Sequence, residues 1–213
     1  MFGAVRQNGY VVDDLDEAVH RWVSVTGAGP FFVLRHLPLD EFSYLGQSSA
    51  PDISIALGNL GELQIELIQQ HNDAASPYLN FRQAKGAGLH HLSAWATDYD
   101  DELARLRQAG AEPDCAGRIA GSARFAYFNA AGTDGCVFEI SELGRDNEYG
   151  FLHDMVRQAA ADWDGSDPMR VLDPVGLGVP PRAQRQSAVT ALGVELDRQN
   201  LVQLNHIGLE AQP

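Results

Sequence analysis

The chain has 213 residues, of which 45% are hydrophobic and 21% are charged, the ordinary balance of a globular protein. It carries 15 Lys and Arg against 29 Asp and Glu, a net charge of −14 that argues against nucleic acid or an anionic membrane surface as partner. Two cysteines are too few for a disulfide framework, and neither a signal peptide nor an apolar run long enough to span a membrane is recognisable, so we expect a cytoplasmic protein.

An internal repeat with an offset of 84 residues organises the chain. Residues 7–12, QNGYVV, correspond to residues 91–96, HLSAWA, and each run predicts a strand followed by an acidic turn and an amphipathic helix. Asp14 and Asp98 stand at equivalent positions and suit helix N-caps, where a carboxylate accepts hydrogen bonds from unpaired backbone N–H groups. Each helix is expected to end at a glycine.

Three strand-like runs follow each predicted helix, so the order β-α-β-β-β occurs twice. The last runs of the two halves match at an offset of 73, so the first half carries about 11 extra residues. We place these residues in a loop around DEFSYLGQSSAP, residues 40–51. The predicted runs are residues 31–37, 53–57 and 63–69 in the first half and residues 112–119, 124–129 and 136–141 in the second.

This order predicts an α+β fold in which two βαβββ modules form a cupped mixed sheet. We expect one domain over residues 4–142, with modules at about 4–71 and 87–142. A C-terminal extension over residues 143–213 should pack against the body or against a second subunit. It is predicted to hold a helix at 146–163, an irregular arm at 164–182, a second helix at 182–200 and an edge strand at 201–209.

Four side chains that can bind a metal occupy corresponding points of the repeat. Gln7 and His91 open the first strands, and Glu66 and Glu139 lie in the last strands. Because side chains alternate along a strand, both carboxylates lie on the face opposite their apolar neighbours, away from the helices. A buried carboxylate is costly unless it is paired or bound to a metal, and two facing carboxylates repel each other. A divalent cation between them would resolve both problems.

The predicted ligand set is rich in oxygen and has one imidazole, which suits Zn²⁺, Ni²⁺, Co²⁺, Mn²⁺ or Fe²⁺ without choosing among them. His91 is preferred to His90 because His91 aligns with Gln7 in the repeat. We interpret His90 as a packing residue or a supporting neighbour of the site. Trp95, two residues further along the face of His91, is a candidate wall of a substrate pocket, and Arg124 is a further pocket candidate.

These residues resemble those of the vicinal-oxygen-chelate superfamily, which includes glyoxalases, bleomycin-resistance proteins and extradiol dioxygenases. The resemblance covers about residues 4 to 142 and is nearest to the methylmalonyl-CoA epimerases. It is carried by three segments: GELQIELIQQ at 61–70, GAGLHHLSAWATDYDDELARLRQAGAE at 86–112 and GCVFEISE at 135–142.

The resemblance implies a metal held by Gln7, Glu66, His91 and Glu139. The first position is usually His in the epimerases and is Gln here, as in some glyoxalase I enzymes. This departure weighs against an extradiol dioxygenase, which holds iron with two His and one Glu. The epimerases also use a second glutamate as a base, and Glu41 is a candidate for it by its rough position in the long first-half loop.

The implied activity is that of a metal-dependent isomerase, epimerase or lyase that stabilises an enolate of a small carbonyl or thioester substrate. Glu139 either only holds the metal or also takes the proton. Two alternatives stay open: a small-molecule binding or sequestering protein, as in the bleomycin-resistance branch, and a non-haem iron dioxygenase. Relatives commonly dimerise, which implies that two chains of this protein can pair.

Overall fold

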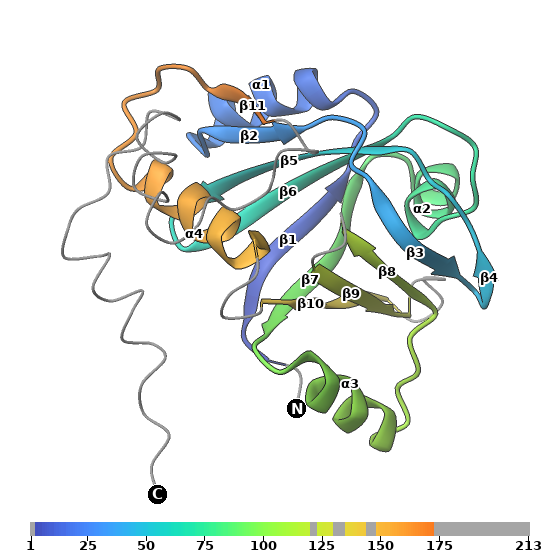
Figure 1. Ribbon diagram of the computed structural model, residues 1–213. Coiled ribbons are helices and arrows are strands. Elements are labelled where there is room, and N and C mark those ends of the chain that lie inside the picture. The colour runs from blue at the N-terminus through green and yellow to red at the C-terminus, as the bar shows by residue number, and fades with distance from the viewer. Residues whose placement is uncertain (1–2, 120–122, 130–134, 144–147, 173–213) are drawn as a thin grey trace, which may run out of the picture.

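A computed structural model of the protein describes residues 3–119, 123–129, 135–143 and 148–172 (Figure 1). The helices are α1 (Leu15–Thr26), α2 (Pro77–Lys85), α3 (Tyr99–Gln108) and α4 (Glu148–Ala161). The strands are β1 (Val5–Val11), β2 (Phe31–Leu34), β3 (Leu39–Tyr44), β4 (Gln47–Ser48), β5 (Ile53–Leu60), β6 (Leu63–Gln70), β7 (Gly88–Ala96), β8 (Cys115–Ile119), β9 (Ala123–Phe128), β10 (Val137–Glu142) and β11 (Met169–Leu172).

The strands form one mixed sheet in the order β11-β2-β5-β6-β1-β7-β10-β9-β8-β3-β4. The repeat is visible as two four-stranded units, β2-β5-β6-β1 and β7-β10-β9-β8, which meet where β1 and β7 pair in antiparallel fashion. On either side of this centre the last strand of each unit, β6 or β10, runs parallel to the first strand of its own unit. The predicted α+β fold with two βαβββ units is therefore confirmed.

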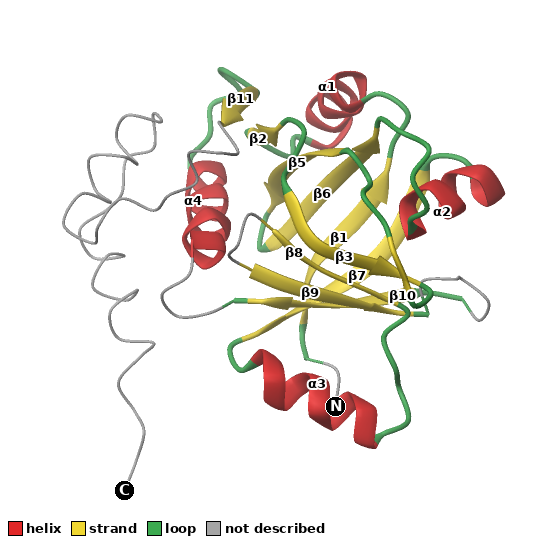
Figure 2. Cartoon of the chain, turned by 45° about the vertical axis from the view of Figure 1, so that its right-hand side comes forward, coloured by secondary structure: helices red, strands yellow, loops and turns green. Residues whose placement is uncertain are grey.

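Helices α1 and α3 cover equivalent outer faces of the two units (Figure 2). The Asp14 side chain accepts a hydrogen bond from the backbone N–H of Glu17 at the start of α1, and Asp98 accepts one from Asp101 at the start of α3. Both predicted N-caps are confirmed. Helix α1 ends at Gly27, whose φ of 73° is a left-handed conformation that favours glycine.

The extra residues of the first half form strands and not only a loop. Strands β3 and β4 make a hairpin, and β3 pairs in antiparallel fashion with β8 of the second unit. Phe42 and Tyr44 of β3 are buried, and Phe42 packs near Phe125 of β9 with 6.3 Å between ring centroids. These aromatic side chains give the hairpin an apolar side, which explains why it lies on the sheet and does not loop into solvent.

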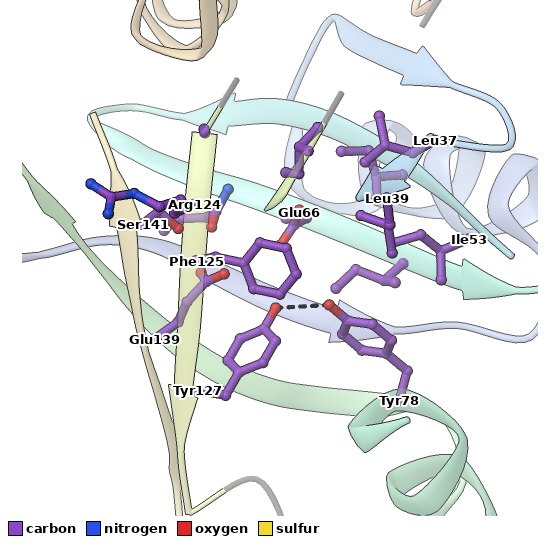
Figure 3. Close-up of a pocket in the computed structure, with 15 residues that line it drawn as sticks. Leu37, Leu39, Ile53, Glu66, Tyr78, Arg124, Phe125, Tyr127, Glu139 and Ser141 are labelled. Atoms are coloured by element: carbon purple, nitrogen blue, oxygen red, sulfur yellow. Dashed lines mark hydrogen bonds between the residues drawn. The ribbon is translucent and has the colours of Figure 1, made fainter. Parts of the chain in front are cut away.

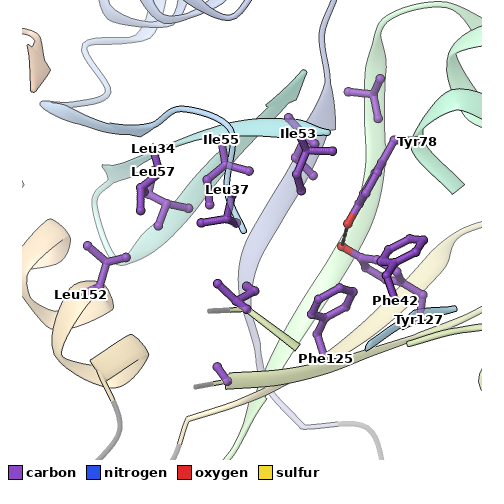
Figure 4. Close-up of a cluster of buried hydrophobic side chains, with 14 of the residues drawn as sticks. Leu34, Leu37, Phe42, Ile53, Ile55, Leu57, Tyr78, Phe125, Tyr127 and Leu152 are labelled. Atoms are coloured by element: carbon purple, nitrogen blue, oxygen red, sulfur yellow. Dashed lines mark hydrogen bonds between the residues drawn. The ribbon is translucent and has the colours of Figure 1, made fainter. Parts of the chain in front are cut away.

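The largest cluster of buried apolar side chains lies inside the cup formed by the sheet (Figure 4). Strands β2 and β5 contribute residues such as Leu34 and Leu57 on one side, and β9 contributes Phe125 and Tyr127 on the other. Helix α4 packs on β5 and adds Leu152, so the extension after the repeat helps to fill the cup. None of the helices described is long and apolar enough to cross a membrane.

Some elements differ from the prediction. Helix α2 was not predicted; it starts at the N-cap Ser76 with a proline in its first turn, both ordinary start signals. Strand β8 begins at Cys115, three residues later than expected, and the arm predicted to be irregular contains β11, which pairs parallel with β2. The predicted helix at 146–163 corresponds to α4. The helix at 182–200 and the strand at 201–209 lie outside the described residues, and the domain division after residue 142 stays a prediction.

Candidate functional site

The four central strands bring the four predicted ligands together on the concave face of the sheet. Gly9 of β1 is paired with Glu66 of β6 on one side and with His91 of β7 on the other. In β10, Glu139 is paired with Ser93 of β7. All four predicted ligands are buried, with exposed fractions of 2% for Gln7, 7% for Glu66, 0% for His91 and 5% for Glu139.

His91 stands between the two carboxylates. Its Nε2 atom lies 3.3 Å from Glu66 Oε2 and 3.4 Å from Glu139 Oε2. His91 Nε2 and Glu139 Oε2 have no hydrogen-bond partner among the described residues, although both are buried. When His91 is protonated, these contacts are ion pairs between the imidazolium and the two carboxylates.

The donor chemistry of this cluster fits a divalent cation: two carboxylates can neutralise its charge, and an imidazole and an amide can complete its coordination. The side chains nevertheless contact one another directly. Among the described residues, no group of three or more His, Cys, Asp or Glu side chains is arranged so that it could hold a metal ion. Binding would therefore require the carboxylates to separate from His91.

The three ionisable groups perturb one another. Burial acts to lower the pKa of His91, but the adjacent carboxylates Glu139 and Glu66 outweigh burial and raise it to about 9. Burial raises the pKa of Glu66 above its ordinary value, and His91 only partly offsets this effect. Burial also acts to raise the pKa of Glu139, but His91 and hydrogen bonds from Ser93 and Ser141 lower it below the ordinary value. Glu139 is therefore ionised at neutral pH.

The ring of His90 contacts the ring of His91. The Nδ1 atoms of the two rings are 3.0 Å apart, and burial lowers the pKa of His90 well below its ordinary value. Neutral His90 can therefore accept the Nδ1–H of His91, which directs His91 Nε2 toward the carboxylates. The rings of Tyr78, Phe81 and Tyr127 surround His90 at centroid distances of 5.2–5.7 Å.

A small pocket, partly open to solvent, lies beside this cluster (Figure 3). Gln7, Glu66 and Glu139 line its polar end. At the same end the hydroxyls of Tyr78 and Tyr127 are hydrogen-bonded at 3.0 Å. The rest of the wall is mostly apolar and includes Leu37, Leu39, Ile53, Ile55, Ile68, Ile119, Ala123 and Phe125.

The other predicted pocket residues are placed differently. Arg124 lines the pocket, and its guanidinium binds Asp100 at 2.7 Å and Glu142 at 2.8 Å. Trp95 stacks on His153 of α4, with 4.4 Å between ring centroids, and Glu41 is an exposed residue of β3 that lies 3.6 Å from Arg118. Neither Trp95 nor Glu41 is among the residues that line this pocket.

The structure also brings in residues that the sequence did not single out. Gln64 Oε1 accepts a hydrogen bond from Gln7 Nε2 at 2.9 Å and lies 2.6 Å from His153 Nδ1. Gln64 shares a strand face with Glu66, so strand alternation could have identified it. His153 and Tyr127 carried no such signal, because neither has a metal-capable counterpart at the matching point of the repeat.

A sequence model of the Glyoxalase/Bleomycin resistance protein/Dioxygenase superfamily matches residues 6–128, more than half of the chain. The chain belongs to this superfamily. The superfamily match includes Gln7, Glu66 and His91 and ends before Glu139. The resemblance inferred from the sequence is thus confirmed at the level of the superfamily. A search of curated proteins found no match.

Solved structures of the superfamily fold are similar to this chain. A methylmalonyl-CoA epimerase from Mycobacterium tuberculosis is 24% identical, with a TM-score of 0.48 over 65% of this chain and 86% of that one. A hypothetical protein from Bacillus halodurans is 20% identical, with a TM-score of 0.48 over 65% and 93% of the two chains. A Streptomyces coelicolor methylmalonyl-CoA epimerase in complex with 2-nitronate-propionyl-CoA is 16% identical, with a TM-score of 0.48 over 67% and 95%. At these identities and TM-scores, the likeness assigns neither a substrate nor a site to this chain.

Gly9 makes room for the imidazole of His91. A Cβ atom on Gly9 would lie 2.0 Å from His91 Cε1 and 2.3 Å from His91 Nε2, far inside van der Waals contact. We expect Gly9→Ala to lower the free energy of unfolding by about 1–3 kcal/mol, because overpacking forces His91 off its position. Denaturant unfolding would measure this change. Gly88→Ala in β7 is the matched control, since a Cβ there meets no atom nearer than 4.0 Å. Equal stability of the two variants would contradict the expectation.

Proposed function

We propose that this protein is a metal-dependent isomerase, epimerase or lyase that forms an enolate from a small carbonyl or thioester substrate. The observation that carries the proposal is the meeting of Glu66, His91 and Glu139 beside the polar end of a pocket, with His91 Nε2 3.3 Å from Glu66 Oε2 and 3.4 Å from Glu139 Oε2. Membership of the superfamily supports it, but a fold alone does not fix an activity.

We infer that one divalent cation is held by Gln7, Glu66, His91 and Glu139. When bound, it would act as a Lewis acid that stabilises negative charge on a substrate oxygen. The donor set suits Zn²⁺, Ni²⁺, Co²⁺, Mn²⁺ or Fe²⁺. The negative charge of Glu139 and the burial of all four side chains favour binding of a cation over an anion at this end of the pocket.

Glu139 is the proposed base. It is ionised at neutral pH, it lines the pocket, and the hydroxyls of Ser93 and Ser141 favour its ionised form. A C–H proton next to the substrate carbonyl would move to a carboxylate oxygen of Glu139 and return to the same carbon or leave with another group. Delivery of a proton to the opposite face of the enolate, by a second proton donor, would give epimerisation.

The pair formed by Tyr78 and Tyr127 supplies a hydrogen-bond donor to the substrate. When two hydroxyls bond to each other, one O–H is used between them and the other is left for another acceptor. Burial raises the pKa of the Tyr78 hydroxyl and that of the Tyr127 hydroxyl well above the ordinary value for tyrosine, so both hydroxyls stay protonated. Both tyrosines line the pocket, so the spare O–H would be available to a substrate oxygen there, and the apolar wall would contact the apolar body of the substrate.

Metal analysis followed by deuterium exchange tests this proposal. We expect the purified protein to bind about one divalent ion per chain, to lose it to a chelator, and to exchange the C–H proton of one class among acyl thioesters, 2-oxo acids and hemithioacetals in D₂O. Protein that binds no divalent ion, or that binds one without exchanging any of these compounds, would contradict the proposal. Ligand binding without exchange would favour a sequestering protein, and oxygen uptake with Fe²⁺ would favour a dioxygenase.

A further inference from the structure

Helix α4 lies beyond the part of the chain that matches the superfamily, yet one of its side chains contacts Gln64, the hydrogen-bond partner of the predicted ligand Gln7. His153 is 2% exposed, its ring stacks on Trp95, and its Nδ1 atom lies 2.6 Å from Gln64 Oε1. Neighbouring residues of the helix, Leu152 and Met155, are anchored in the main apolar cluster. His153 is therefore held at a fixed position relative to the sheet.

The contacts of Gln64 define which atoms donate. Its Oε1 atom is a carbonyl oxygen and can only accept, so the hydrogen in the short contact with His153 must be carried by His153 Nδ1. The same oxygen accepts from Nε2 of Gln7 at 2.9 Å. Burial lowers the pKa of His153 to about 3, so the ring is neutral and only one of its nitrogens carries a hydrogen.

This arrangement selects one orientation of the Gln7 amide. The two ends of an amide have nearly the same shape, but only the oxygen end can bind a cation. The amide nitrogen of Gln7 donates its hydrogen bond to Gln64 on the neighbouring strand β6. The other end of the amide, Oε1, is therefore the atom available to the pocket that Gln7 lines. If Gln7 were turned around, two carbonyl oxygens would face each other within the sheet.

We propose that His153, acting through Gln64, is a positioning residue that fixes the Gln7 amide with its oxygen toward the bound cation. The inference rests on the proposed function and adds a role for the C-terminal extension in it. Neither His153 nor Gln64 touches the cation in this arrangement. Their contribution is to keep one ligand oriented correctly before the cation arrives, as supporting hydrogen bonds do in other metal sites.

Binding of Co²⁺ to the full chain provides the test, with calorimetry for affinity and visible absorption for the ligand set. We expect His153→Leu and Gln64→Leu each to weaken Co²⁺ binding by about 10-fold and to shift the Co²⁺ spectrum toward that of Gln7→Leu. His153→Asn keeps an N–H close to the position of Nδ1 and should restore most of the affinity. Met155→Leu, a volume-conserving change in the same helix, is the control and should bind Co²⁺ like the wild type.

A double variant separates positioning from a general structural effect. In the Gln7→Leu background, adding His153→Leu should cost no further affinity, because the side chain that it positions is absent. An equal loss in both backgrounds, or a wild-type spectrum in folded His153→Leu, would overturn the inference while leaving the proposed function intact. If His153→Leu does not fold, Gln64→Leu and His153→Asn decide by the same criteria. Wild-type protein that binds no Co²⁺ would overturn the proposed function and this inference with it.

Discussion

Replacing Glu139 with Gln is expected to slow exchange of the substrate C–H proton by about 10²–10⁴-fold, the usual contribution of a positioned general base. The carboxylate lies in β10 with 5% exposure, and Ser93 and Ser141 hold it in an ionised state at neutral pH. An amide has nearly the same shape and can still offer an oxygen to a cation, but it cannot accept the proton. Deuterium incorporation in D₂O, followed by NMR, measures the effect.

Metal content must be determined on the same Glu139→Gln sample, because a loss of cation would also lower the rate. Glu102→Gln is a suitable control: Glu102 lies in α3, is paired with Arg105 and does not line the pocket. The control should exchange at the wild-type rate. A Glu139→Gln protein that retains its cation and its full rate would show that Glu139 only holds the metal.

The affinity of the protein for a divalent cation is expected to rise about tenfold per pH unit between pH 7 and about 9, and then to level off. In the metal-free protein the carboxylates raise the pKa of His91 to about 9, so binding at His91 Nε2 must release a proton below that pH. Burial raises the pKa of Glu66 as well, and any proton on Glu66 acts in the same direction. Competition with a calibrated chelator at several pH values measures the slope.

The same proton affects the stability of the metal-free protein. The pKa of His91 is higher in the folded protein than in the unfolded chain. Protonated His91 therefore stabilises the folded state fully below pH 6.5, and this stabilisation is lost as the pH rises through about 9. The loss is on the order of 3 kcal/mol by the usual conversion of pKa shifts. His91→Gln removes the titrating group and should flatten the pH dependence of both stability and metal affinity. An unchanged steep slope in that variant would assign the proton to another group.

The repeat made the centre of the site predictable. Gln7 and His91 match at the repeat offset of 84 residues, and Glu66 and Glu139 match at the offset of 73. Because β1 and β7 are equivalent strands paired at the centre of the sheet, Gln7 and His91 lie near each other, with Gln7 opposite Ser93 and His91 opposite Gly9. The same register separated His91, which contacts both carboxylates, from His90, which lies among aromatic rings. Cation binding by this quartet stays a prediction.

Features without a counterpart in the repeat could not be predicted in this way. His153 comes from a helix outside the two units, and its contact with Gln64 joins residues 89 positions apart. The pairing of Tyr78 with Tyr127 depends on α2, whose short sequence has little amphipathic pattern. The supporting residues of the site therefore depend on tertiary packing that no local period reveals. Pairing of two chains and a cytoplasmic location also stay predictions.

The β3–β4 hairpin ties the two halves of the molecule together. It belongs to the first unit in sequence but completes the exposed edge of the second by pairing with β8. We expect that neither half folds on its own, because each would leave a strand edge or an apolar hairpin uncovered. The arrangement matches that of domain-swapped dimers, in which one copy lends an element to another, except that here the exchange is within a single chain. A chain divided between β6 and α2 would yield two fragments that regain the fold only by recombining.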